Sequence, residues 1–542
     1  MRSSVARRTA LLVVAATSVA LLAAACTGEP EPKPSDEDGR GILGGLEGVE
    51  LSQGTLLISD GTPRVRIGDA VVTFPSSVTD AVWSPDGSRI AYVDGDGNIA
   101  TARPDGTDVL VLTTTDSSVV RSRPAWLRQW IVYAEKKADG TSTLRSVPAN
   151  GCPIGPVPAA GQEWPMDTGP GTSYVDLAPS AANTEQPMRL AFQHDEPGGP
   201  EIWINDSNQR VPFTYKVVDG SEPAITPDGQ RLAYIGPDGD IYVTIPTEGA
   251  PAGTRITSGA GHPTRLTWSP DGQYVAYATD AEVQQISASG GANAPTSLGA
   301  TGVPSYLYGW DNALYPVTGG DPTALSVAAS QARWPQVASF APGQGYLGAL
   351  TATIGLASQP PTPGQFGPVL LLDSADQLDP RVAGELRRVF GLIPSDMPDL
   401  ARPQVYVASP VSDAVAQELS RLGYHVLRER PELERAFPLA PADLCPSSNG
   451  PELAPELVVV DGDDLAAVSI GRSFAGQRPI LLLNGALTEE QATWLRRSSG
   501  VVEYVYVIGS VPEDVQQQIA QLIAGPLGYS TTHNPVAPPS LY

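Results

Sequence analysis

The chain has 542 residues, of which 41% are hydrophobic and 17% are charged, and its formal net charge is −25. This length exceeds one ordinary domain, and so acidic a surface repels nucleic acid and anionic lipid headgroups, which excludes nucleic acid as a partner. The 55 glycines and 53 prolines favour a structure with many turns, as in all-β proteins.

The first 26 residues have the pattern of an export signal. Three arginines give a positive start, residues 10–25 are almost wholly apolar, and Cys26 follows three alanines. A charged start, an apolar core and small residues before a cleavage site predict a signal peptide over residues 1–25. The apolar run of 16 residues is shorter than the roughly 20 that a permanent membrane-spanning helix needs.

The end of this segment, Leu-Ala-Ala-Ala-Cys at residues 22–26, resembles the lipobox of bacterial lipoproteins. The resemblance implies a diacylglycerol on the thiol of Cys26 and a position on the extracytoplasmic face of the cell membrane. An ordinary signal peptide with an incidental cysteine is the alternative. Residues 26–48 are polar, acidic and rich in Pro and Gly, so we expect an extended tether there.

The middle of the chain contains an internal repeat. Residues 81–93, 224–235 and 266–278 each read as a strand, a turn with Pro-Asp-Gly and a second strand. Weaker copies fill the gaps, so that equivalent positions recur every 42 to 51 residues at Trp83, Trp126, Leu177, Ile225, Trp268 and Trp310. A four-stranded unit with this period is typical of a β-propeller.

The Trp-Ser-Pro-Asp-Gly copies resemble the TolB-like and WD40-like propeller repeats of exported bacterial proteins. We expect an all-β propeller over residues 49–358, with seven blades and with six as the alternative. Residues 337–350 would supply the first two strands of a blade whose last two strands lie within residues 54–67, which would leave no open sheet edge.

The pattern changes after a Pro-rich linker at residues 359–366. Continuous apolar strands, such as those at 457–460 and 480–483, alternate with helical patterns over residues 367–530. Fully apolar strands are typical of parallel sheets covered on both faces, so we expect an α/β parallel-sheet domain here. Residues 531–542 form a tail.

The sequence of this second domain also repeats, with Gly-Tyr pairs at residues 423–424 and 528–529. Residues 458–466, 479–482 and 505–510 resemble the type 2 cell-wall-binding repeat of Gram-positive surface proteins. The resemblance implies association with an anionic wall polymer through tandem copies. The family usually carries three copies, whereas this chain has fewer than two.

The candidate site residues lie in both domains. Asp461, Asp463 and Asp464 follow a predicted strand, at the edge where α/β sheets bind ligands. They could hold a metal or a sugar, but we favour a role in capping the next helix. Cys152 and Cys445 are candidates for a disulfide, with two free thiols as the alternative.

Two motifs of known catalytic sites, the nucleophile elbow and the Gly-rich phosphate loop, are absent from the sequence. We therefore expect no catalytic residue, metal or cofactor. The expected function is a non-enzymatic, lipid-anchored envelope protein whose propeller binds protein or glycan and whose C-terminal repeats associate with the cell wall. The alternative is an envelope hydrolase or sugar-processing enzyme that uses Asp461, Asp463 and Asp464.

Overall fold

The computed structural model describes residues 51–127, 129–151, 162–163, 173–179, 189–206, 213–290, 294–309, 312–333, 347–352, 369–397, 402–407, 411–428, 456–475, 479–525 and 529–530. The expected signal peptide and tether lie outside these residues, as do Cys26, Cys152 and Cys445. No helix in the described part of the chain is long and apolar enough to cross a membrane.

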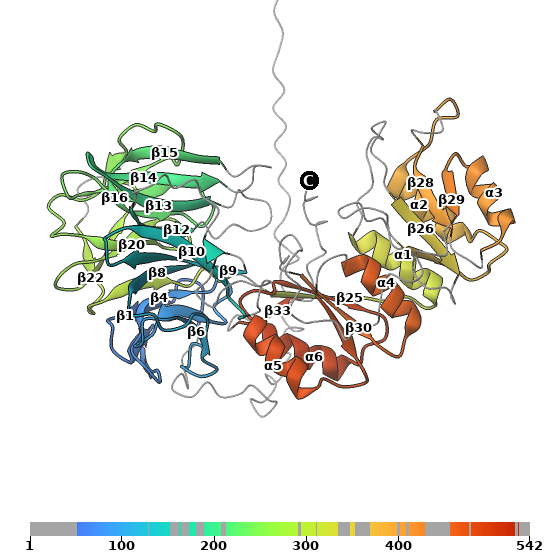
Figure 1. Ribbon diagram of the computed structural model, residues 1–542, viewed down its shortest axis with the longest axis horizontal. Helices are drawn as coiled ribbons and strands as arrows, with labels where there is room; N and C mark the ends of the chain where they lie inside the picture. Colours follow the sequence, from blue (N-terminus) through green and yellow to red (C-terminus); the bar gives the residue numbers. More distant parts are fainter. Residues whose placement is uncertain are drawn as a thin grey trace, which may run out of the picture. The chain divides into compact units, whose positions relative to one another are not determined.

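Within the described residues, six four-stranded antiparallel sheets form the blades of a β-propeller (Figure 1). The first blade consists of β24 (Val303–Tyr306), β1 (Leu56–Ser59), β2 (Arg64–Ile67) and β3 (Ala70–Thr73). The second consists of β4 (Thr79–Trp83), β5 (Ile90–Val93), β6 (Ile99–Ala102) and β7 (Leu110–Val111). The third consists of β8 (Val119–Leu127), β9 (Trp130–Lys137), β10 (Ser142–Pro148) and β11 (Gln162–Glu163).

The remaining three blades follow in chain order. The fourth consists of β12 (Ser173–Pro179), β13 (Arg189–Glu196), β14 (Gly199–Asp206) and β15 (Phe213–Asp219). The fifth consists of β16 (Ser221–Ile225), β17 (Leu232–Ile235), β18 (Ile241–Thr244) and β19 (Thr254–Arg255). The sixth consists of β20 (Thr264–Trp268), β21 (Tyr274–Ala278), β22 (Val283–Ser287) and β23 (Thr296–Ser297).

The ring closes by pairing strands from the two ends of the propeller sequence. β24 runs antiparallel to β1, with Ser305 opposite Leu57. The prediction of seven blades is therefore wrong, and the alternative of six is correct. The count is one too high because the sixth repeat copy and the closing blade are the same blade.

The turns that carry Asp-Gly have one common geometry. In the second blade the Ser84 hydroxyl donates to Asp86 Oδ1 at 2.7 Å, and Gly87 takes the left-handed conformation with a φ of 74°, which a residue with a Cβ rarely adopts. Asp228 and Asp271 hold the equivalent turns of the fifth and sixth blades. Asp86 is buried, whereas Asp228 and Asp271 are exposed.

Two parallel sheets make up the rest of the described chain (Figure 1). The four-stranded sheet has the order β27 (Val369–Leu372), β26 (Leu347–Ala352), β28 (Gln404–Val407), β29 (His425–Arg428). The five-stranded sheet has the order β31 (Ile480–Leu483), β30 (Glu456–Asp461), β32 (Tyr504–Ile508), β25 (Asn312–Val317), β33 (Tyr529–Ser530). The predicted parallel-sheet domain is confirmed.

The two sheets share one topology, but the propeller segment ends earlier than expected. The order β27–β26–β28–β29 is repeated by β31–β30–β32–β25, so β25 takes in one sheet the place that β29 takes in the other. Residues 313–315 and 347–350 fall within the predicted propeller range of 49–358, but they lie in β25 and β26. β25 pairs in parallel with β32, and β26 pairs in parallel with β28. Such short apolar strands do not reveal their pairing partner locally.

Helices connect and cover the parallel strands. They are α1 (Pro322–Arg333), α2 (Pro380–Phe390), α3 (Asp413–Arg421), α4 (Leu465–Ala475), α5 (Glu489–Ser498) and α6 (Glu513–Ile523). Asp379 caps α2 by accepting from the Arg381 N–H, and Thr488 and Gln491 form a capping box at α5. Apolar side chains from these helices pack on both faces of the five-stranded sheet, which explains why residues 457–460 are fully buried.

Candidate functional site

Four charged residues occupy equivalent positions on the innermost strands of four blades. They are Asp80, Arg123, Glu222 and Arg265, with φ values of 53°, 52°, 53° and 59°. Each lies where the pairing of its strand shifts register. Because non-glycine residues in this left-handed region store strain, other interactions must hold all four in place. We call these residues the charge ring.

Ion pairs and backbone hydrogen bonds join the charge ring. The guanidinium of Arg123 donates to both carboxylate oxygens of Glu222, at 2.7 and 2.8 Å, and Arg265 Nη2 lies 3.0 Å from Asp80 Oδ1. The same carboxylates also accept backbone N–H groups, from Arg123 to Asp80 at 3.0 Å and from Arg265 to Glu222 at 2.8 Å. Each acid therefore contacts both arginine residues.

The electrostatics of the charge ring follow from its partial burial. Burial acts to raise the pKa of Glu222, but the hydrogen bonds and charges of Arg123 and Arg265 outweigh it, so the pKa lies below its usual value. Burial and the charge of Arg123 lower the pKa of Arg265, and Asp80 and Glu222 offset this only in part. The Arg265 cation is therefore less than fully compensated by its neighbours.

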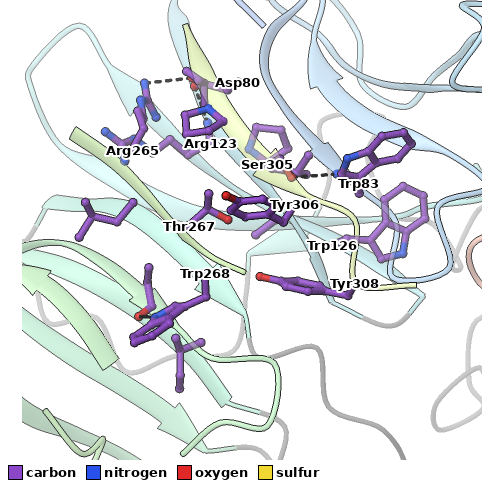
Figure 2. A pocket seen from close by; sticks show the side chains of 18 of the residues that line it. Asp80, Trp83, Arg123, Trp126, Arg265, Thr267, Trp268, Ser305, Tyr306 and Tyr308 are labelled. Carbon is purple, nitrogen blue, oxygen red and sulfur yellow. Dashed lines mark hydrogen bonds and ion pairs between the residues drawn. The ribbon is translucent and has the colours of Figure 1, made fainter. Parts of the chain in front are cut away.

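A pocket of about 130 Å³ adjoins the charge ring, and Asp80, Arg123 and Arg265 line one part of it (Figure 2). The rest of the lining is largely aromatic and apolar, with the side chains of Trp83, Trp126, Trp268, Tyr306 and Tyr308. Figure 2 shows Tyr306 and Tyr308 pointing into the space between the tryptophans. The combination of aromatic walls and a few convergent polar groups is typical of ligand sites in proteins.

The polar groups of the aromatic walls are mostly engaged. The Tyr306 hydroxyl donates to Gln285 at 2.6 Å, and the Trp268 indole N–H donates to the carbonyl of Ala224 at 2.9 Å. Burial raises the pKa of both Tyr306 and Tyr308 to about 12. These hydroxyls therefore stay neutral at physiological pH and add no charge to the pocket.

The second and third blades also contact the C-terminal domain. Asp86 Oδ2 accepts from the Gly500 N–H and from the Asn312 side-chain amide, both at 3.2 Å. The Trp126 indole N–H donates to the carbonyl of Gly500 at 3.1 Å, and Val501 shares a core cluster with Trp126. Gly500 and Val501 precede β32, and Asn312 begins β25, so these contacts involve the amino ends of the parallel strands.

The predicted aspartate cluster lies at the opposite, carboxyl end of β30. Asp464 Oδ1 accepts from the backbone N–H groups of Ala466 and Ala467, both at 3.0 Å, in the first turn of α4. Asp461 Oδ1 accepts from the Asp463 N–H at 3.0 Å. The favoured interpretation of Asp464 as a helix cap therefore agrees with the geometry. The side chain of Asp463 is exposed.

A further group of potential metal ligands is found on β13 and β14. His194, Glu196 and Glu201 bring one ligand atom each within 4.8 Å of one another. Glu201 accepts from the Trp203 indole at 3.0 Å and from the Lys216 ammonium at 2.5 Å. Since Lys216 already supplies a positive charge at this point, we interpret the group as a structural ion pair.

Comparison with known proteins identifies related folds. No family model matches the sequence, and no curated protein matches it. TolB from Acinetobacter baumannii is similar over 47% of this chain and 66% of its own, with 16% identity and a TM-score of 0.34. A putative TolB from Agrobacterium tumefaciens covers 45% of this chain and 87% of its own, with 14% identity and a TM-score of 0.33.

A third similar structure is the β-propeller domain of Cps50 (Swd1) from Myceliophteria thermophila. It covers 47% of this chain and 87% of its own, with 13% identity and a TM-score of 0.32. This chain spans just under two thirds of the Acinetobacter protein. The similarities concern the propeller fold alone.

Sequence reasoning missed the charge ring, although the repeat contains the signal. Each member lies three residues before the Trp or Ile position by which the copies are aligned, as Asp80 precedes Trp83. In chain order the four charges alternate in sign. A search for charged residues at matching repeat positions would have found them, but not their pairing, because Arg123 and Glu222 are 99 positions apart.

Proposed function

We propose that this chain is an exported, lipid-anchored protein of a Gram-positive cell envelope. The observation that carries the proposal is the N-terminal sequence, in which a positive start and an apolar run lead to Leu-Ala-Ala-Ala-Cys at residues 22–26. The acidic, Pro-rich residues 26–48 then provide a tether between a lipid surface and the folded body.

In this proposal the propeller is the binding platform and the parallel-sheet domain associates with the cell wall. The charge ring and its adjoining pocket support the first role, because strained charged residues beside an aromatic cavity are typical of functional sites. The motif resemblance of residues 458–466, 479–482 and 505–510 to wall-binding repeats is the support for the second role. The capping role of Asp464 favours a binding protein over an enzyme that uses the aspartates.

Lipid attachment is tested by changing Cys26 to Ala and supplying cells with an alkyne-labelled fatty acid. The unchanged protein should take up label and sediment with membranes, and the variant should lose both properties. Cys152→Ala, which removes another cysteine, should behave like the unchanged protein. Label on the Cys26→Ala variant, or none on the unchanged protein, would contradict the anchor.

Wall association is tested with the full-length Cys26→Ala protein on isolated wall sacculi, with and without their anionic polymers, across a salt series. Retention that disappears with the polymers supports the wall role. No retention at any salt concentration would remove this role and leave the propeller as the binding part of the protein.

A further inference from the structure

The size of the propeller pocket limits what it can hold. Its volume of about 130 Å³ is close to the roughly 150 Å³ of an engineered apolar cavity that binds benzene. Trp83, Trp268 and Tyr308 line it with aromatic surface. One aromatic ring or one branched aliphatic side chain therefore fits, and the remainder of any larger ligand must lie outside.

Arg265 is the charged group of the pocket with unused hydrogen-bonding capacity. A guanidinium has five N–H donors. Within the described residues, the guanidinium of Arg265 makes one ion pair, which is to Asp80. Its side chain is 25% exposed, so a ligand can reach it. By contrast, the side chains of Asp80 and Glu222 are 5% and 12% exposed, and each contacts both arginines.

The electrostatics of Arg265 favour an added anion. Burial and the charge of Arg123 lower its pKa, and the two acids do not fully compensate. A carboxylate on the free N–H groups of Arg265 would stabilise the cation and satisfy these donors. The left-handed backbone at Arg265, with a φ of 59°, is the kind of strain that proteins retain at binding sites.

We propose that this pocket binds the C-terminal residue of a peptide or protein. The terminal carboxylate pairs with Arg265, and the last side chain, aromatic or branched aliphatic, lies among the tryptophans and tyrosines. The net charge of −25 repels small free anions at long range, which favours a carboxylate carried by a longer chain with contacts of its own. The assignment rests on the proposed role of the propeller as the binding platform.

The test measures binding of acetyl-Gly-Ser-Gly-Phe to the full-length protein purified in detergent, with tryptophan fluorescence and calorimetry as readouts. The peptide with a free carboxylate should bind at least ten times more tightly than the same peptide with an amidated end. This comparison needs no protein variant, so a folding defect cannot obscure it. Arg265→Gln should cause a similar loss.

Arg255→Gln is the matched control, because Arg255 is a surface arginine that pairs with Asp238 and Asp240 outside the pocket. It should leave the affinity within twofold. Equal binding of the amidated peptide, or no binding of either peptide, would overturn the inference. Binding of 3-phenylpropanoate as tight as that of the peptide would overturn the assignment to a chain terminus. The assays of lipid attachment and wall retention test the proposed function separately, and their outcomes do not depend on the results of this binding experiment.

Discussion

The guanidinium of Arg123 holds both carboxylate oxygens of Glu222, at 2.7 and 2.8 Å, and so connects the third blade to the fifth. The Arg265 N–H reaches the same carboxylate from the sixth blade at 2.8 Å. One glutamate therefore links the third, fifth and sixth blades. We therefore expect the charge of Glu222 to affect the stability of the propeller.

Glu222 should make the propeller less stable in acid. Its pKa in the folded protein lies below its usual value of 4.5, so the folded state binds its proton less readily than the unfolded chain does. The resulting stabilisation is complete above pH 4.5 and is lost as the pH falls through the lower folded pKa. Urea unfolding at a series of pH values should show this decline, and Glu222→Gln should reduce the slope.

The control for this experiment is Glu248→Gln, which neutralises an exposed acid in the same blade. It should leave the pH dependence of the unfolding midpoint nearly unchanged. At pH 7 we expect Glu222→Gln to cost about 2 kcal/mol, because it leaves two partly buried arginines without their shared partner. An unchanged pH profile in Glu222→Gln would show that the pair contributes nothing to stability.

Asp86→Asn tests the contact between the propeller and the C-terminal domain. An Asn amide would direct N–H groups at the Gly500 N–H and the Asn312 amide, which now donate to Asp86 Oδ2. Asp271→Asn is the control, because it makes the same change in the equivalent turn of the sixth blade, where the carboxylate is exposed. It should show the loss of hydrogen bonding within the turn without the loss at Gly500 and Asn312. We expect Asp86→Asn to be about 1–2 kcal/mol more destabilising, with faster hydrogen exchange at Gly500. Equal effects would mean that the contact adds no stability.

Gly500→Ala tests the same contact by adding a methyl group. The new Cβ would lie 3.0 Å from atoms of Ser84 and Trp126, on a backbone with a φ of +80°. Gly485→Ala is the control, because Gly485 has a φ of +83° and nothing lies within 4 Å of an added Cβ. It should lose only the free energy of placing a Cβ on a left-handed backbone, about 1 kcal/mol. Gly500→Ala should unfold at clearly lower urea concentration than Gly485→Ala. Equal midpoints would show that Ser84 and Trp126 move aside freely.

Asp464→Ala tests whether this aspartate caps α4. The change removes the acceptor for the N–H groups of Ala466 and Ala467, so these amides should exchange faster and stability should fall by about 1 kcal/mol. Asp463→Ala is the control, because its side chain is exposed and its removal should have little effect. If both variants retained normal exchange in α4, the capping role would be excluded.

The two-part architecture of this protein could be predicted from its amino-acid sequence. The repeat length and the Pro-Asp-Gly turns predicted a propeller. The turns are visible in the sequence because Asp86 and Gly87 shape them through contacts and backbone angles that involve residues only a few positions apart. Continuous apolar runs such as residues 457–460 predicted a parallel sheet, because a strand buried on both faces has no polar positions. The preference for a helix cap at Asp464 likewise followed from local spacing.

The number of blades, the placement of β25 and β26, and the pairing of residues in the charge ring follow from the tertiary fold and could not be predicted locally. A short strand offers the same backbone hydrogen-bonding groups to a parallel or an antiparallel neighbour, so residues 313–315 could not reveal that their partner is β32. The pairing of Arg123 with Glu222 and of Arg265 with Asp80 depends on ring closure by β24 and β1. These contacts join residues far apart in the chain, which no local pattern encodes.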